Sequence, residues 1–169
     1  MTRLETRGEL TIDGERFAVS GLSWLDREWS TSALGPELVG WDWFALQFDD
    51  GRDLMFYRLR RADGSSDALS AGSIVDPNGS VNSNGSTMKL SIQDVVLEPL
   101  SWFESADGAA RYPSRWRLRV PSRNIDVTLT PRVDDQELRV TVRYWEGAVR
   151  IDGTIGGSGF VEMTGYRAK

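Results

Sequence analysis

Hydrophobic and polar residues alternate with a period of two along nearly the whole chain, in short runs bounded by Gly, Asp, Asn and Pro. This period is typical of β-strands, whose successive side chains point to opposite faces. An apolar pattern of helical period longer than two turns is hard to find, and the connections are too short for the crossover helices that parallel strands need. The sequence therefore predicts an all-β domain with an antiparallel sheet.

Two hairpins are expected where turn-forming residues separate such runs. Residues 7–12 and 16–20 flank an Asp-Gly pair, in which glycine tolerates the positive φ of a two-residue turn. Residues 41–48 and 52–60 flank Asp-Asp-Gly and form the clearest predicted hairpin. Further strands are expected at residues 22–29, 73–75, 87–93, 115–120, 125–130, 137–145, 148–155 and 160–166, and loops at residues 30–39 and 76–86.

No shift of composition divides the chain, so residues 1–169 are expected to form a single domain. Closing an antiparallel sheet into a barrel removes its exposed edges. A barrel of about eight strands has an interior that side chains fill or that holds one small ligand. We therefore predict an antiparallel, lipocalin-like β-barrel of about 8–10 strands, with a β-sandwich as the alternative.

The chain has 25 acidic and 20 basic residues, a net charge of −5, and neither cysteine nor histidine. Nucleic-acid binding depends on clustered Lys and Arg, so no nucleic-acid partner is expected. Without thiolate or imidazole groups a Ser-His-Asp triad is impossible, and no metal site or cofactor is expected. No apolar run reaches the length of a membrane span, and the first residues lack the apolar segment of a signal peptide, so no membrane span is expected and the compartment is left open.

Charged residues on apolar strand faces are the candidates for a functional site. For example, Leu138, Val140, Val142 and Tyr144 form a row that is expected to point inward, and Glu146 continues it. A buried charge has to be paired or protonated, because an isolated one costs several kcal/mol. Two interpretations stay open: salt bridges that fix strand register, or acids around a ligand cavity that raises their pKa. The polar candidates are Asp26, Glu28, Asp42, Arg58, Glu146 and Glu162.

Seven tryptophans supply large rigid apolar surfaces, which suit either a core or the walls of a pocket for a flat or elongated apolar ligand. Trp102 and Trp145 lie near strand ends, where the mouth of a barrel is expected. The candidate ligand-binding residues are Trp24, Arg27, Trp29, Trp41, Trp43, Tyr57, Arg58, Tyr144, Trp145, Glu146 and Glu162, and the candidate catalytic residues are Asp26, Glu28 and Asp42.

Four motifs, at residues 24–29 (Trp-Leu-Asp-Arg-Glu-Trp), 40–44 (Gly-Trp-Asp-Trp-Phe), 144–147 (Tyr-Trp-Glu-Gly) and 159–166 (Gly-Phe-Val-Glu-Met-Thr-Gly-Tyr), span nearly the whole chain. With these motifs the sequence resembles the AttH-like lipocalin family, which includes carotenoid 1,2-hydratase. The resemblance implies two lipocalin-like barrels in a full-length member, of which this chain is the C-terminal one. It also implies an apolar ligand, since the family's hydratases add water to an isoprenoid double bond.

The resemblance leads to three functional hypotheses. The leading one is a barrel that binds a lipophilic small molecule such as an isoprenoid or polyene. The second is a hydratase or cyclase in which Asp26 or Glu28 protonates an alkene while Trp29 and Trp41 stabilise the carbocation through their π faces. The family's hydratases have histidine at the position of Arg27, and a guanidinium does not serve as an acid at ordinary pH. The third hypothesis is a module that docks against a partner, N-terminal lipocalin-like barrel.

Overall fold

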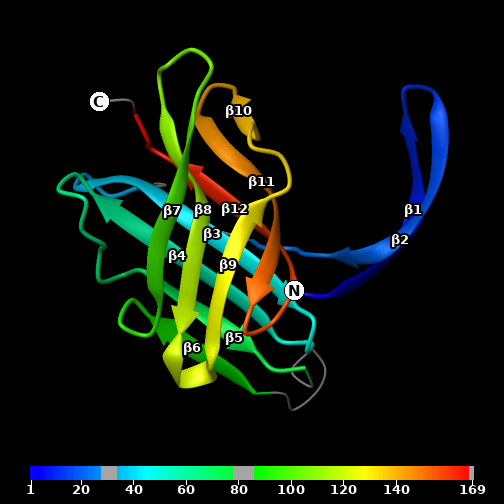
Figure 1. Cartoon of the computed structure of the whole chain (residues 1–169), viewed down its shortest axis with the longest axis horizontal. Coiled ribbons are helices and arrows are strands. Elements are labelled where there is room, and N and C mark those ends of the chain that lie inside the picture. The colour runs from blue at the N-terminus through cyan, green and yellow to red at the C-terminus, as the bar shows by residue number, and fades with distance from the viewer. Residues whose placement is uncertain (28–33, 78–85, 168–169) are drawn as a thin grey trace.

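The computed structural model describes residues 1–27, 34–77 and 86–167. Figure 1 shows a strongly curled antiparallel sheet from which a two-stranded ribbon projects on one side. The strands are β1 (Leu4–Ile12), β2 (Glu15–Ser23), β3 (Leu38–Phe48), β4 (Asp53–Arg61), β5 (Ala71–Val75), β6 (Thr87–Ser91), β7 (Val96–Glu104), β8 (Arg111–Val120), β9 (Ile125–Pro131), β10 (Glu137–Arg139), β11 (Arg143–Gly153) and β12 (Gly157–Thr164), with a 3-10 helix η1 at Pro121–Arg123.

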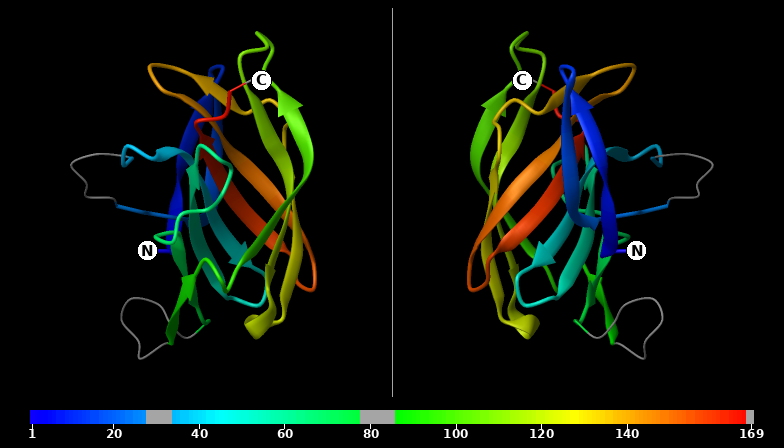
Figure 2. Two further views of the ribbon diagram at one scale, coloured as in Figure 1. Left: turned by 90° about the vertical axis from the view of Figure 1, so that its left-hand side faces the viewer. Right: turned by 90° about the vertical axis from the view of Figure 1, so that its right-hand side faces the viewer.

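The main sheet has ten strands, hydrogen-bonded in the order β6-β5-β4-β3-β12-β11-β9-β8-β7, with β10 attached to β11. The side views in Figure 2 show it curled so that β3 and β4 face β8 and β9 across the interior. The predicted antiparallel, lipocalin-like architecture is confirmed. Within the described ranges β6 and β7 do not pair, so the barrel has an open seam instead of the full closure expected from the sequence.

One apolar core fills the middle of the barrel. Phe44, Leu46 and Phe48 point inward from β3, and alternate residues of β8, including Trp116 and Leu118, meet them from the opposite wall. The rings of Phe44 and Trp116 pack edge to face with their centroids 5.6 Å apart. Alternation along the strands therefore sends one set of side chains into this core and the other set to the convex outer face.

Both predicted hairpins are confirmed. Asp13 and Gly14, between β1 and β2, have φ values of 50° and 84°, as a two-residue hairpin turn with two positive φ angles requires. Gly51 has a φ of 87° in the turn between β3 and β4. Asp49-Asp50-Gly51 is thus a hairpin turn, as the sequence indicated.

The single strand predicted at residues 137–145 is wrong. The chain forms a small hairpin there, in which Glu137 of β10 lies opposite Trp145 of β11. The apolar row at Leu138, Val140 and Val142, expected to point inward, is exposed. Because the chain reverses direction at residues 140–142, the alternation of β11 is not continuous with that of β10, and Trp145 rather than its neighbour Tyr144 points inward.

Strand β7 was not expected, because Pro99 interrupts its alternating pattern. A proline cannot donate to a backbone ladder and is tolerated in an edge strand. Strand β7 is the last in the sheet order, which explains why it accepts Pro99. The strand predicted at residues 148–155 is the second half of β11 together with the following turn, and the strand predicted at residues 22–29 ends at Ser23 with β2.

The β1–β2 ribbon lies apart from the barrel (Figure 1) and has two different faces. Leu10, Ile12, Phe17 and Val19 are all exposed, and the register, which pairs Leu10 with Phe17, places all four on one face. The other face carries Glu5, Arg7, Glu9 and Arg16. An isolated two-stranded ribbon of this kind is marginally stable in water. Its base is tied to the barrel, where Arg3 Nε lies 2.9 Å from Asp53 Oδ1.

Candidate functional site

One row of inward-facing residues runs across five neighbouring strands, β4, β3, β12, β11 and β10. Asp42 of β3 lies opposite Arg58 of β4 on one side and Met163 of β12 on the other. Met163 lies opposite Trp145 of β11, which in turn lies opposite Glu137 of β10. Directly paired residues project from the same face of a sheet, so the row brings two acids and an arginine into an otherwise apolar interior.

Asp42 is completely buried and is the centre of a polar group of side chains. Its Oδ2 accepts a hydrogen bond from Arg58 Nε at 2.7 Å, and its Oδ1 accepts one from the Tyr166 hydroxyl at 2.8 Å. Arg60 Nε lies 3.3 Å from Oδ2. We call Asp42, Arg58, Arg60 and Tyr166 the Asp42 cluster.

Tyr166 reaches this cluster because of the glycine before it. If strand alternation continued beyond β12, Tyr166 would share the outer face with Glu162. Gly165 has a φ of 76°, a conformation that L side chains rarely adopt, and it interrupts the alternation, so that Tyr166 reaches the interior residue Asp42. A Cβ at Gly165 would also overlap the backbone of Val39 and Gly40, so this close approach requires glycine.

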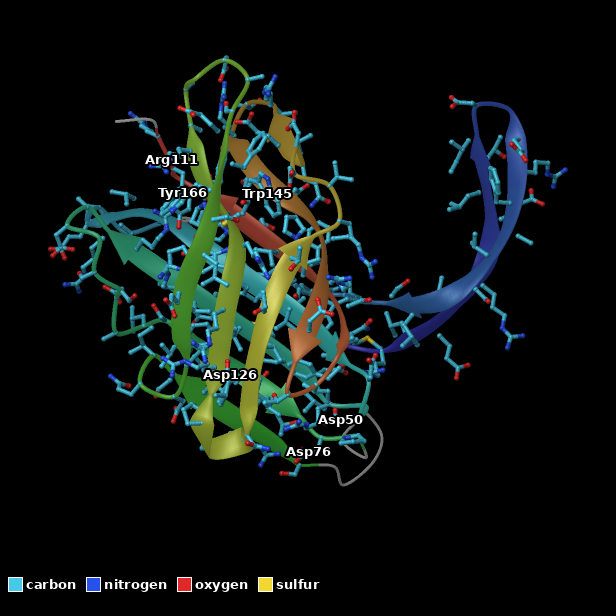
Figure 3. All side chains as sticks on the ribbon, viewed as in Figure 1. Asp50, Asp76, Arg111, Asp126, Trp145 and Tyr166 are labelled. Atoms are coloured by element: carbon cyan, nitrogen blue, oxygen red, sulfur yellow. The ribbon has the colours of Figure 1, made fainter. Side chains whose placement is uncertain are left out.

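Aromatic rings surround the Asp42 cluster at one end of the barrel. The Tyr166 ring lies 5.7 Å from that of Tyr112 and 6.4 Å from that of Trp102, and the Arg60 guanidinium carbon lies 3.7 Å from the Tyr166 centroid. The Arg58 guanidinium lies 5.1 Å from the Trp116 ring centroid. Figure 3 shows Tyr166 near Trp145 and Arg111, at the same end of the barrel.

The electrostatics of the cluster keep the Tyr166 phenol protonated and Arg58 charged. Burial, reinforced by the negative charge of Asp42, raises the pKa of Tyr166 above its ordinary value. Burial also raises the pKa of the neighbouring Tyr112 to about 12. For Arg58, burial lowers the pKa, but the charges and hydrogen bonds of Asp42 and Tyr166 together outweigh it, so that the pKa of Arg58 is raised. At neutral pH the two tyrosines are therefore hydrogen-bond donors and not anions.

A second ion network adjoins the first at this end of the barrel. Arg143 Nη1 donates to Glu137 Oε1 at 3.0 Å, and Arg143 Nη2 donates to Asp107 Oδ2 at 2.6 Å. Tyr112 Oη lies 3.4 Å from Glu137 Oε1 and links this network to the rings around Tyr166. Hydrogen bonds from Arg143 and Ser105 lower the pKa of Asp107, which stays ionised.

Most of the predicted ligand-binding residues lie on the convex outer face instead. Trp43 lies opposite both Tyr57 and Glu162, and Glu162 lies opposite Glu146. Trp41 Nε1 donates to Glu162 Oε1 at 2.8 Å. The Trp41 ring packs against Tyr144, and the Trp43 ring packs against Trp24. The expectation that Glu146 points inward is therefore wrong, because the reversal at residues 140–142 turns it outward. Glu162, which was expected in the same polar cluster, pairs with Glu146 on the outer face.

The remaining candidates are distributed between surface and core. Asp26 and Arg27 are exposed, and Asp26 Oδ2 accepts a 2.7 Å hydrogen bond from Trp24 Nε1. Trp145 is fully buried, and its Nε1 donates to the Asp134 carbonyl at 2.9 Å, which is the environment of a core residue. Glu28 and Trp29 lie outside the described residues.

The structure adds Arg60, Tyr112, Trp116 and Tyr166 to the two predicted residues Asp42 and Arg58. Arg60 lies two residues after Arg58 on β4, and residues two apart on a strand share a face. The argument that identified Arg58 could therefore have identified Arg60 as well. Among residues 1–27, 34–77 and 86–167, no group of three or more acidic side chains lies together as metal ligands would. Within those ranges no helix is long and apolar enough to cross a membrane.

The model of the AttH-like family matches residues 1–166. The chain belongs to this family. An AttH structure from Nitrosomonas europaea is 34% identical over 98% of this chain and 51% of its own, with a TM-score of 0.84. The AttH-like chain also shares the fold of kievitone hydratase from Nectria haematococca, at 24% identity and a TM-score of 0.73, over 99% of this chain and 52% of the hydratase. The chain thus spans about half the length of these solved structures. A comparison with curated proteins found no match.

Proposed function

We propose that the barrel binds a lipophilic small molecule whose polar end meets the Asp42 cluster. The observation that carries this proposal is the position of the cluster: charged side chains lie inside the barrel, at an end where Trp102, Tyr112 and Trp116 surround them. Binding sites for small molecules combine apolar and aromatic walls with a few polar groups that orient the ligand. An isoprenoid or polyene with one polar end has the matching chemistry.

A hydratase-type reaction, the activity named for the relative from Nectria haematococca, would use the same interior groups. Of the predicted catalytic carboxylates that the structure describes, Asp42 lies beside interior polar groups and Asp26 is exposed. Both Asp42 oxygens already accept hydrogen bonds, from Arg58 and Tyr166. This arrangement favours holding and orienting a ligand over transferring a proton, and we therefore place binding first.

Titration with all-trans retinol tests the binding proposal through quenching of tryptophan fluorescence. We expect saturable quenching, and we expect Trp102→Leu to weaken binding about tenfold, because it removes an aromatic wall worth on the order of 1.4 kcal/mol. Trp102 is 44% exposed, so the fold tolerates this change. The matched control is Trp43→Leu on the outer face, where no effect on affinity is expected. Absence of quenching across a panel of polyenes and isoprenoids would contradict the proposal, as would loss of binding in the outer-face variant alone.

A second candidate function is docking against a partner lipocalin-like barrel, with this chain as the C-terminal half of a two-barrel protein. Two observations favour it. The β1–β2 ribbon exposes an apolar face formed by Leu10, Ile12, Phe17 and Val19, and such contiguous apolar surface marks interaction sites. Both solved relatives are about twice as long as the matched region, which leaves room in each for a partner domain.

Co-expression with the unmatched half of the relative from Nitrosomonas europaea tests the docking function. We expect the two chains to purify as a stable complex, and we expect Phe17→Asp to abolish it, because a charge would be buried in the apolar contact. Ser20→Asp places the same charge on the opposite face of the ribbon and is expected to leave the complex intact. Failure of the wild-type chains to associate, or equal loss in both variants, would contradict docking through this face.

A further inference from the structure

Two buried nitrogen atoms form no hydrogen bond in the described part of the chain: Arg60 Nε, within the Asp42 cluster, and Trp116 Nε1, whose ring packs against Arg58 of that cluster. Trp116 is 1% exposed and points into the barrel, where its ring lies beneath the Arg58 guanidinium. Arg60 Nε lies 3.3 Å from Asp42 Oδ2 but does not have the direction that a hydrogen bond requires. Buried N–H groups are rarely left without an acceptor, so each of these two indicates a missing acceptor.

The charge balance of the cluster points to the same conclusion. Two guanidinium groups, those of Arg58 and Arg60, face one carboxylate, that of Asp42. Tyr166 donates its proton to Asp42 and adds no negative charge. The next acid along the row, Glu137, is taken by Arg143 at 3.0 Å and by Arg139 at 2.8 Å. The interior cluster therefore has one more positive charge than negative charge, together with an excess of donors.

We propose that this site binds the anionic head of a lipophilic carboxylic acid, with the carboxylate accepting hydrogen bonds from Trp116 Nε1 and Arg60. The inference rests on the proposed function and names the class of ligand. A carboxylate has two acceptor oxygens in one plane, which suit a guanidinium and a second donor beside it. It also supplies the negative charge that the two arginines lack. The apolar body of the acid would lie against the aromatic rings next to the cluster.

The site is reachable by such a head group from the end of the barrel. The side chains of Arg58 and Arg60 keep 17% and 11% of their surface exposed, whereas Asp42 beneath them keeps none. Trp102, at the rim, is 44% exposed, and the Arg111 guanidinium lies 4.9 Å from its ring centroid. A positive charge at the rim would also attract an anionic ligand before it binds.

Comparison of three ligands with the same carbon skeleton tests the inference on the unaltered protein. Retinoic acid, retinol and methyl retinoate differ in the head group alone, so the comparison cannot be confused by unfolding of a variant. We expect retinoic acid to bind at least about tenfold more tightly than the other two, because it alone carries a charge for Arg60. Equal affinity for all three would overturn the inference and leave the proposed function standing. No binding of any of them would overturn both.

Two variants then test which donors cause the tighter binding of retinoic acid than of retinol. Trp116→Phe keeps a large ring but removes Nε1, and Arg60→Met keeps the length of the side chain but removes its charge. We expect each to lower the ratio of retinoic acid affinity to retinol affinity, because the acid loses a hydrogen bond to a charged group whereas the alcohol loses at most a neutral one. Arg117→Met, in the surface ion pair with Asp126, is the matched control and should not alter the preference. A preference that survives in both interior variants would overturn the assignment of the donors.

Discussion

Asp42→Asn is expected to lower the free energy of unfolding by about 3–5 kcal/mol, because it leaves two largely buried guanidinium groups without their counter-charge. Asparagine keeps the size of the side chain and one acceptor oxygen, but it removes the negative charge that lies 2.6 Å from Arg58 Nη2 and 3.3 Å from Arg60 Nε, and Tyr166 would face a weaker acceptor. Urea denaturation followed by tryptophan fluorescence at neutral pH measures the change. The protein would unfold at a clearly lower urea concentration.

The control for this variant is an ion pair at the surface. Asp126→Asn breaks the pair with Arg117, whose side chain is 43% exposed, and water replaces the lost partner, so a small change in stability is expected. Combining Asp42→Asn with Arg58→Met should recover part of the stability, because one of the unpaired charges is then absent. An Asp42→Asn protein as stable as the wild type would show that the cluster does not stabilise the fold.

Trp145→Ala is expected to destabilise the protein by about 3–5 kcal/mol, since it removes the whole side chain of a buried residue and leaves a cavity. Trp145 is 0% exposed and also loses its hydrogen bond to the Asp134 carbonyl. The matched control is Trp102→Ala, because Trp102 is 44% exposed and its loss creates no closed cavity. Thermal and urea unfolding of the two variants compare the same substitution in two environments.

This pair of variants distinguishes the two roles that the sequence leaves open for tryptophan. A core tryptophan is needed for stability, whereas a tryptophan at the rim of a binding site is needed for affinity and little for stability. We expect Trp145→Ala to behave as the first and Trp102→Ala as the second. Equal stability loss in both variants would contradict the assignment of Trp102 to the rim.

The alternation of side chains was sufficient to predict the part of the site that lies in regular strands. Asp42 and Arg58 belong to a hairpin with a clear turn, so their shared face follows from the spacing of their apolar neighbours. The same alternation places Trp41 and Trp43 on the face opposite that of Asp42, although both were expected to bind the ligand. Within one uninterrupted strand, odd-numbered and even-numbered residues point to opposite faces of the sheet, so the residue number alone decides the face.

This alternation no longer predicts the face of a side chain where the chain departs from a continuous strand. The unexpected reversal at residues 140–142 contains no glycine or proline, and it turned Glu146 from a predicted interior acid into an outer one. Gly165 reverses the expected direction of Tyr166, because a positive φ is invisible in the hydrophobic pattern. Strand β7 was missed because Pro99 is acceptable only at a sheet edge, and the sequence alone does not reveal which strand is at the edge.

The open seam between β6 and β7 gives this barrel a freedom that a closed cylinder lacks. In a closed barrel the number of strands and their stagger fix the diameter, and widening it breaks backbone hydrogen bonds. Here the two end strands of the sheet, β6 and β7, form no ladder with each other in the described residues, although residues 92–95 connect them at one end. Separation of β6 from β7 beyond this connection would therefore break no ladder hydrogen bond of the sheet.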